Sequence, residues 1–417
     1  MIDTTSSCTS AADGSLSADE ARRRMREAIS PLTGRETVAV RDALGRILAA
    51  NVTATHDVPA HDNSAMDGYA VNFDSLAGDG ETSLTVVGGA FAGKPFSGQV
   101  GKGLAVRIMT GAVLPAGADT VIMHEATRQD GNKVLVPAGQ KRGQNIRRAG
   151  EDLACGGVAL AAGKRIGPAE LGLIASLGVV ELIVKRRLRV AFFSTGDELV
   201  SLGTPLAPGQ VYDSNRYTLY GLLTALGAEI IDMGVVPDQP AALEAALLEA
   251  AQNADAIITT GGVSVGDADF VKEVLARLGE VKFWKLAIKP GRPMAFGKVG
   301  NAWLFGLPGN PVAAMITFVE FARDALLRLA GLDPIPDFPL LSLPAGNDIH
   351  KQAGRRSYLR GAVAVVNGRW QVRTMAYQGS GILRSMSEAN CLVVLPEDCA
   401  GVKAGEMVQI QLFEGLF

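Results

Sequence analysis

Hydrophobic and polar positions alternate in a regular order along the middle of the chain. Short apolar runs typical of buried strands lie at 188–196, 228–236, 255–262 and 302–310. Segments with apolar residues at helical spacing follow them, at 214–227, 239–252, 269–279 and 311–331. Alternating strands and helices are typical of βαβ units, whose strands run parallel. The pattern therefore predicts a doubly wound, mostly parallel α/β sheet.

Different patterns lie on either side of this region. Residues 17–50 and 167–179 have helical spacing, with Ser17 and Glu20 placed for a capping box. Strand-like runs broken by Gly and Pro fill 55–150, and they return after a Pro-rich linker at 332–340. We predict a multidomain α/β plus β protein with a disordered tail (1–14), a discontinuous helix-containing connecting domain (15–54 and 151–187), a β-rich domain (55–150), the α/β domain (188–334) and a C-terminal small β-barrel (335–417).

Composition places the chain among ordinary globular proteins. The chain of 417 residues is longer than a domain with a single hydrophobic core usually is. Hydrophobic residues make up 47% of it. A net charge of −3 gives no reason to expect nucleic acid or an anionic membrane as a partner. The sequence shows no secretion signal, no apolar run long enough to span a membrane and no C-x-x-C pair among its four cysteines. We expect a cytoplasmic protein that binds neither nucleic acid nor membranes.

Unusual residues follow the carboxyl end of each predicted strand. Glu198 follows the first strand, Asp238 the second, and a glycine-rich turn starting at Gly261 the third. The fourth strand ends in Gly-Leu-Pro-Gly-Asn-Pro at 306–311. Each feature alone is an ordinary turn, helix cap or helix break. Because open α/β sheets bind ligands at this edge, the shared location predicts a binding site.

Charged residues near this edge indicate the kind of ligand. Lys285, Lys289 and Arg292 alone could be exposed strand charges, but beside glycine-rich turns they suit an oxyanion. Together with carboxylates such as Asp269, they suit a phosphorylated ligand carried with Mg²⁺. No P-loop motif is present, and no G-x-G-x-x-G follows the first strand, which argues against a P-loop NTPase and a dinucleotide cofactor.

A second concentration of unusual residues lies in the β-rich region. Segment 61–71 gathers polar residues around Asp67-Gly68, which alone would be a tight turn. Thr110 precedes a glycine, and segment 144–152 combines arginines with Glu151 and Asp152. Arginines beside acids and glycines favour an anion or metal site over a hydrophobic core.

Eight motifs, in order, resemble those of the molybdopterin molybdenumtransferase family, the MoeA type, which also occurs as the E domain of gephyrin-like proteins. They are DNSAMDGYA, RIMTGA, GQNIRRAGEDL, FSTGDEL, YDSN, TGGVSVGDAD, FWKLAIKPGRPMAFG and GLPGNPVA. The resemblance runs from about residue 17 to the end of the chain and includes QGSGILRSMSEANCLVVLP. Asp267 stands where such sequences often carry Glu, a change that preserves the charge.

The resemblance implies a Mg²⁺-dependent transferase of molybdenum cofactor biosynthesis. Such an enzyme inserts molybdenum from molybdate into adenylylated molybdopterin, releasing AMP and giving Mo-molybdopterin. The resemblance further implies a molybdopterin-binding, MogA-like α/β domain and a homodimer with shared active sites, in which the α/β domain of one chain faces the β-rich domain of its partner. A separate molybdopterin adenylyltransferase would donate the substrate, and apo-molybdoenzymes or their chaperones would accept the product.

The resemblance also assigns residues, each by its matching motif. The catalytic positions are Asp67, Thr110, Asp152, Glu198, Asp238, Asp269, Lys285 and Lys289, of which Glu198, Asp238 and Asp269 would hold the metal or its waters. Of the substrate-binding positions, the resemblance assigns Pro308, Pro311 and Ser380. The turns and charges at the sheet edge add Gly261, Gly262, Ser264, Gly266, Arg292, Gly309 and Asn310. The two lysines would bind phosphate or molybdate, whereas Asp67, Thr110 and Asp152 would close the site.

Two other functions compete with this interpretation. A molybdopterin adenylyltransferase or a CinA-like nucleotide hydrolase would share the Gly-Gly turn, but CinA-like proteins typically continue it as GGLGPT, and here it reads GGVSVG. A non-catalytic dimeric scaffold would bind ligands without turnover, and the retention of the acidic and basic site positions argues against it.

Overall fold

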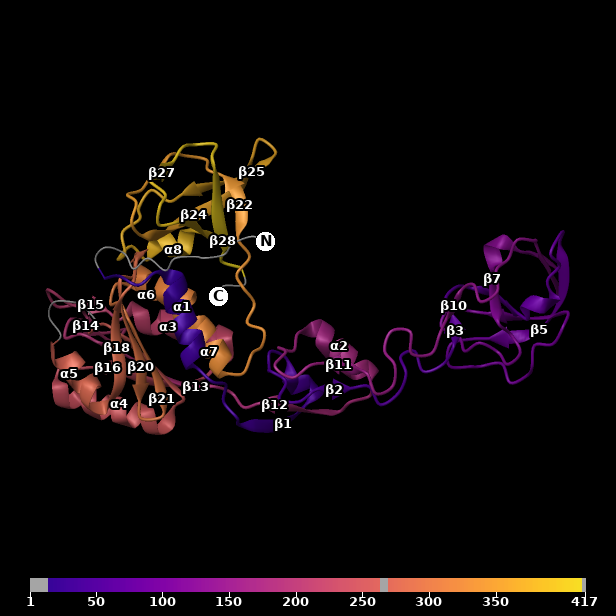
Figure 1. Ribbon diagram of the computed structural model, residues 1–417, viewed down its shortest axis with the longest axis horizontal. Helices are drawn as coiled ribbons and strands as arrows, with labels where there is room; N and C mark the ends of the chain where they lie inside the picture. Colours follow the sequence, from indigo (N-terminus) through magenta and orange to yellow (C-terminus); the bar gives the residue numbers. More distant parts are fainter. Residues whose placement is uncertain (1–13, 263–268, 415–417) are drawn as a thin grey trace, which may run out of the picture. The chain divides into compact units, whose positions relative to one another are not determined.

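The computed structural model describes residues 14–262 and 269–414, which fall into two compact units. The larger unit comprises Met1–Glu36, Gly45–Ile47 and Val184–Phe417, and the β-rich unit comprises Thr37–Leu44 and Leu48–Ile183 (Figure 1). The chain passes from one unit to the other within β1 (Arg35–Ala39) and within β12 (Glu181–Lys185), and also on either side of Gly45–Ile47. None of the described helices is long and apolar enough to cross a membrane.

A six-stranded sheet of order β16-β13-β17-β21-β20-β18 forms the centre of the larger unit (Figure 1). The strands are β13 (Arg189–Thr195), β16 (Glu229–Val236), β17 (Ala256–Thr260), β18 (Gly279–Lys285), β20 (Pro293–Val299) and β21 (Ala302–Leu307). The first four in the sheet order are parallel; β20 is antiparallel to both of its neighbours, β21 and β18, so β18 at the edge runs in the same direction as the first four. The predicted mostly parallel α/β sheet is therefore confirmed.

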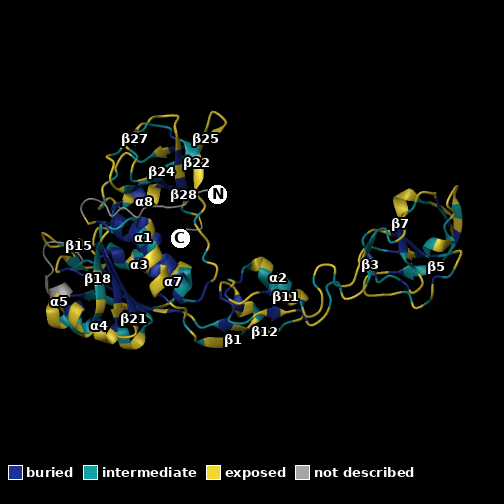
Figure 2. Cartoon of the chain, in the orientation of Figure 1, coloured by how far each residue is buried: buried dark blue, intermediate teal, exposed yellow. Residues whose placement is uncertain are grey.

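Helices cover both faces of this sheet because its strands are apolar on both faces. Along β13, Phe192 packs into the core that includes α3 (Ser214–Leu226) and α1 (Ala18–Ala28), whereas Phe193 packs into the core that includes α4 (Pro240–Asn253) and α5 (Asp269–Leu278). The central strands β13, β17 and β21 are almost entirely buried (Figure 2). Full burial of each such side chain contributes roughly 1.5–3 kcal/mol.

Two sequence-based predictions of helices are corrected by the structure. The helix expected over 17–50 ends at Ala28; Ser17 does cap it by accepting the Glu20 N–H at 3.2 Å, but Pro31 disfavours helical backbone immediately before it. The helix expected over 311–331 is split into α6 (Pro311–Thr317), a π-helical turn η4 (Phe318–Ala322) and α7 (Arg323–Leu329).

The C-terminal part of the larger unit forms a second sheet, of order β19-β24-β26-β28-β22 with β25 on β24. Its strands are β19 (Ile288–Lys289), β22 (Leu341–Pro344), β24 (Arg356–Val366), β25 (Arg369–Thr374), β26 (Cys391–Leu395) and β28 (Met407–Leu412); β23 (Ile349–His350) pairs with β27 (Gly401–Val402), and α8 spans Arg384–Glu388. The short strand β19 lies between β18 and β20 in the chain, and its pairing with β24 joins this sheet to the α/β domain.

The β-rich unit has its own six-stranded sheet, of order β7-β4-β6-β5-β9-β8. Its strands are β4 (Gly68–Val71), β5 (Thr82–Ala90), β6 (Leu104–Ile108), β7 (Thr120–Met123), β8 (Arg128–Asp130) and β9 (Lys133–Val136). Two short pairs accompany it, β3 (Asn63–Ser64) with β10 (Ile146–Arg147) and β2 (Val52–Thr53) with β11 (Val158–Leu160), together with the helix α2 (Pro168–Ser176). The strand-rich character predicted for 55–150 is thus confirmed.

Candidate functional site

The carboxyl ends of the parallel strands surround a hollow of about 1180 Å³, here called the edge hollow. Thr195 ends β13, Gly261 and Gly262 follow β17, and segment 308–311 follows β21. The hollow therefore lies where open α/β sheets bind their ligands. The short strands β14 (Leu199–Val200) and β15 (Val211–Tyr212) form part of its wall.

The structure gathers most of the site residues expected in this unit around the edge hollow. Those that line it are Glu198, Gly261, Gly262, Lys289, Arg292, Pro308, Gly309, Asn310, Pro311 and Ser380. Asp238 and Lys285 are exposed but do not line it. Ser264, Gly266 and Asp267 lie outside the described residues, as does the side chain of Asp269.

Bare backbone forms the floor of the edge hollow. Gly261 has φ +88°, and a Cβ at this position would collide with the carbonyl oxygen of Thr195. A Cβ at Gly309 would lie 3.6 Å from Gly261 Cα, so the turns after β17 and β21 are in close contact. Glycine is required at 261, where it permits the approach to Thr195 and leaves main-chain groups beside the hollow for a ligand.

Asp213 and Asn215, which belong to the YDSN motif but were not among the predicted site residues, also line the edge hollow. Thr260 Oγ1 donates to Ser194 Oγ at 3.0 Å, and Ser194 Oγ donates to Asp213 Oδ1 at 3.0 Å. Asn215 Nδ2 donates to the carbonyl of Gly309 at 2.7 Å. Asp213 Oδ2 and Asn215 Oδ1 are buried and have no partner among the described residues. Such acceptors are suited to ligand N–H groups.

The acidic residues near this edge differ in their surroundings. Glu198 is exposed in the hollow, whereas Asp238 Oδ1 accepts a hydrogen bond from the Thr195 hydroxyl. Asp238 is not the cap of α4, whose N-cap residue is Gln239. Among the described side chains, those of 14–262 and 273–414, no three His, Cys, Asp or Glu residues are grouped closely enough to hold a metal ion.

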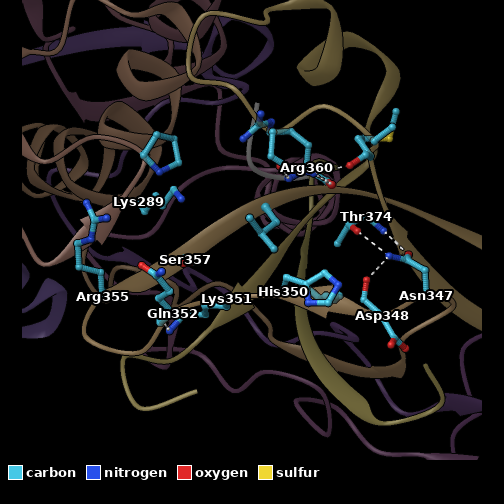
Figure 3. A pocket seen from close by; sticks show the side chains of 16 residues that line it. Lys289, Asn347, Asp348, His350, Lys351, Gln352, Arg355, Ser357, Arg360 and Thr374 are labelled. Carbon is cyan, nitrogen blue, oxygen red and sulfur yellow. Dashed lines mark hydrogen bonds between the residues drawn. The ribbon is translucent and has the colours of Figure 1, made fainter. Parts of the chain in front are cut away.

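A second hollow of about 630 Å³, here called the barrel hollow, lies along β24 and is strongly cationic (Figure 3). In this view Lys289 and Arg355 lie on one side, and Asn347, Asp348 and Thr374 lie on the other. Lys289, Pro290 and Gln378 line both hollows, so the two hollows adjoin.

Arg360 is a fully buried cation in the lining of the barrel hollow. Its Nε donates to Ser385 Oγ at 3.0 Å and its Nη2 to the Gly379 carbonyl at 3.0 Å, but Nη1 has no partner among the described residues. Burial lowers the pKa of Arg360 to about 10, so it remains protonated at neutral pH. A buried guanidinium paired only with neutral groups is suited to a ligand anion.

The β-rich unit brings Asp67 and Thr110 together. The Thr110 N–H and its hydroxyl both donate to Asp67 Oδ1, each at 2.7 Å. These two hydrogen bonds, the backbone one first, lower the pKa of Asp67 and keep it ionised. The result is an exposed carboxylate held in one orientation.

Segments 61–71 and 144–152 also meet in this unit. Asp62 accepts hydrogen bonds from the Ala149 N–H at 2.8 Å and from Arg148 Nη1 at 2.6 Å, and Ser64 pairs with Ile146 between β3 and β10. The side chain of Asp152 is exposed, and its N–H donates to the Val58 carbonyl at 3.1 Å. Two motifs that are distant in sequence therefore form one polar surface.

Comparisons with family models cover most of the chain. Residues 16–178 match the MoeA N-terminal region (domain I and II), and residues 191–328 match a "Probable molybdopterin binding domain". Residues 342–413 match the MoeA C-terminal region (domain IV).

Relatives and solved structures agree with these matches. The chain is 43% identical over 403 residues to a molybdopterin molybdenumtransferase of Haemophilus influenzae, covering 96% of this chain and 99% of that protein. It is 38% identical to a molybdopterin molybdenumtransferase of Nostoc, covering 90% of this chain and 88% of that protein. A crystal structure of a molybdopterin biosynthesis MoeA protein from Pyrococcus horikoshii superimposes with a TM-score of 0.82 at 29% identity, covering 95% of this chain and 99% of that one.

Proposed function

Because this chain belongs to the molybdopterin molybdenumtransferase family and acts in molybdenum cofactor biosynthesis, we propose that it inserts molybdenum from molybdate into adenylylated molybdopterin and releases AMP. One observation carries the proposal, namely that a hollow with a bare backbone floor adjoins a cationic hollow at Lys289. The first suits an extended nucleotide-linked substrate and the second a compact dianion.

Adenylylated molybdopterin occupies the edge hollow in this proposal. The main chain at Gly261 and Gly262 and the cations Lys289 and Arg292 lie where they can bind its pyrophosphate. The unpartnered oxygens of Asp213 and Asn215 accept hydrogen bonds from the N–H groups of its heterocycles. The binding and catalytic roles assigned by resemblance to Glu198, Asp238, Lys285 and Ser380 belong to the same proposal.

Molybdate occupies the barrel hollow beside Arg360. The unpartnered Nη1 supplies a charge-assisted hydrogen bond, and Lys289 neutralises the second negative charge. Since Lys289 lines both hollows, it places the oxyanion next to the pyrophosphate end of the other substrate.

Mg²⁺ is proposed to bind with the substrate rather than in a preformed protein cage. Mg²⁺ commonly takes one or two carboxylates plus substrate phosphates and waters, so Glu198 and Asp238 are sufficient donors. When bound, the ion would neutralise negative charge on the pyrophosphate. In this proposal, water hydrolyses the phosphoanhydride bond and gives molybdopterin and AMP. The side chain of Asp269 remains the third candidate ligand.

The proposed assembly is a homodimer with shared active sites. In it the partner's Asp67 and Thr110 face the edge hollow, and Asp152 assists in closing it. The hydrogen bonds that hold Asp67 ionised and oriented are consistent with such a role. A molybdopterin adenylyltransferase supplies the substrate, and apo-molybdoenzymes or their chaperones receive the product. The five-part domain division predicted from the sequence remains part of this proposal.

The test is an incubation of the purified protein with adenylylated molybdopterin, Mg²⁺ and molybdate, followed by chromatography of AMP. Release of AMP that depends on molybdate, with a product that activates an apo-molybdoenzyme, is the expected result. Formation of adenylylated molybdopterin from molybdopterin and ATP would instead identify an adenylyltransferase. A folded dimer that binds these compounds without turnover would identify a scaffold.

A further inference from the structure

A buried ionic cluster lies two residues along β24 from Arg360. Nη2 of Arg22, on α1, contacts Glu320 Oε2 and lies 3.2 Å from the hydroxyl oxygen of Tyr358. Nε of Arg22 donates to the backbone oxygen of Glu320 at 3.0 Å. Glu320 and Tyr358 are almost completely buried. We refer to Arg22, Glu320 and Tyr358 as the buried triad.

The buried triad joins elements that carry both hollows. Glu320 lies in the π-helical turn η4, which continues the helix that begins at Pro311 in the wall of the edge hollow. Tyr358 lies on β24, whose Ser357 and Arg360 line the barrel hollow. A π-helical turn inside an α-helix is often found at a functional site.

Helix α1 holds β24 at a second point near the buried triad. Arg356, at the start of β24, donates two hydrogen bonds to Asp19 of α1, at 2.8 and 2.7 Å. Because side chains alternate along a strand, Arg356, Tyr358 and Arg360 project from the same side of β24, with neighbours about 7 Å apart. A shift of the β24 backbone at Tyr358 would therefore also move Arg360, two residues further along the same strand.

On the basis of these contacts, and resting on the proposed function, we infer that the buried triad positions Arg360 for molybdate. Arg22, Glu320 and Tyr358 are positioning residues, since none of them lines either hollow. They fix β24 against α1 and η4, and so they set the distance between Arg360 in the barrel hollow and the wall of the edge hollow.

Stability alone does not explain the buried triad. Buried ions lose their hydration, and apolar side chains of similar volume often give equal or greater stability. Glu320 Oε1 is also buried without a partner among the described residues, which adds a further cost. Charged and hydroxyl groups form directional hydrogen bonds and ion pairs, which apolar side chains do not.

The test replaces the ion pair by apolar side chains in the double variant Arg22→Met/Glu320→Met. Its melting temperature is expected to equal or exceed that of the wild type, which shows that the fold is kept. The Kd for inorganic molybdate, measured by calorimetry, and the KM for molybdate in AMP release are expected to rise about 10- to 100-fold, with a smaller change in kcat.

The matched control is Arg23→Met/Glu27→Met, which removes the surface ion pairs of Arg23 with Glu27 and with Glu20, each at 2.7 Å, from the same helix. It is expected to leave the melting temperature, the Kd and the KM unchanged. A folded Arg22→Met/Glu320→Met variant with a wild-type Kd and KM for molybdate would overturn the inference.

A second variant covers the case in which the double variant does not fold. Tyr358→Phe removes one hydroxyl and keeps the ring, and it is expected to weaken molybdate binding in the same direction by a smaller factor. An unchanged Kd in this variant would then overturn the inference. The wild-type protein could bind molybdate but release no AMP, while the variants bind molybdate more weakly. That result would support the inference and contradict the proposed function. A wild-type protein that binds no molybdate would overturn both.

Discussion

The two adjoining hollows of the larger unit differ in whether main-chain or side-chain groups determine their properties. The edge hollow owes its shape to main chain, because glycine at 261 lets two strand ends come together. The barrel hollow owes its character to side-chain charge, with Arg360 buried and Lys351 and Arg355 in its lining. Backbone conformation can follow an extended phosphate ester, whereas fixed cations suit a compact oxyanion. The comparison predicts that substitutions in each hollow affect different substrates.

The largest effect is expected from Gly261→Val. The new side chain would collide with the carbonyl oxygen of Thr195 in a backbone with φ +88°, so the strand ends must separate. AMP release should fall about 100-fold or more, mainly through loss of adenylylated molybdopterin binding. Gly221→Ala in α3, where a Cβ meets nothing within 4 Å, is the control and should stabilise by about 0.5–1 kcal/mol. Near-normal activity of Gly261→Val would contradict the main-chain explanation of the edge hollow.

Arg360→Met should have the next largest effect, and it should be confined to molybdate. The charge-assisted hydrogen bond proposed from Nη1 is worth about 1.5–3 kcal/mol, so the KM for molybdate should rise about 10- to 100-fold. Steady-state AMP release at varied molybdate and at varied adenylylated molybdopterin measures the two KM values separately. An equal rise in both would remove the distinction between the hollows.

Lys289→Met should affect both substrates because Lys289 lines both hollows. Loss of one partly exposed cation should raise each KM about tenfold. Lys282→Met, on the exposed surface of β18, removes the same charge without touching either hollow and should change neither KM. An effect of Lys289→Met on one substrate only would place Lys289 in a single hollow.

The smallest effect concerns the β-rich unit. Removing the hydroxyl in Thr110→Ala should raise the pKa of Asp67 toward its usual value of 3.8, while the backbone hydrogen bond remains. Because the folded pKa is depressed, the stabilisation from ionised Asp67 is complete above the unfolded pKa and disappears as the pH falls through the folded value. NMR titration of the carboxyl carbon measures the shift. Thr127→Ala, which removes only a hydrogen bond to His124, should leave the Asp67 titration unchanged.

The sequence was sufficient to predict the sheet because its strands are continuous apolar runs separated by amphipathic helices. It also placed the unusual residues at the sheet edge where the edge hollow lies, since they follow the strand ends. It did not predict that α1 ends at Ala28 or that the Asp213 side chain caps α3 by accepting the Arg216 N–H. The Asp-Ser-Asn motif at 213–215 was visible as part of the resemblance, but its buried acceptors follow only from tertiary contacts.

Arg360 was missed for a related reason. An arginine in a strand-like segment is usually exposed, and only the packing of α8 and segment 377–379 around it buries its guanidinium. The spacing of Arg356, Tyr358 and Arg360 at every second position was the available signal, since it placed three polar side chains on one face of a strand. Long-range partners such as Glu320 and Arg22 leave no comparable signal in the local sequence.

The two-residue strand β19 has a consequence for how this protein can be divided. Its neighbours in the chain belong to the α/β sheet, but β19 itself pairs with β24 through Ile288–Arg356 and Lys289–Ser357. A deletion that removes the C-terminal sheet would therefore leave an unpaired strand edge beside Lys289, where a foreign strand can attach. The α/β domain and the C-terminal sheet are not interchangeable modules, because a segment encoded within one completes the other.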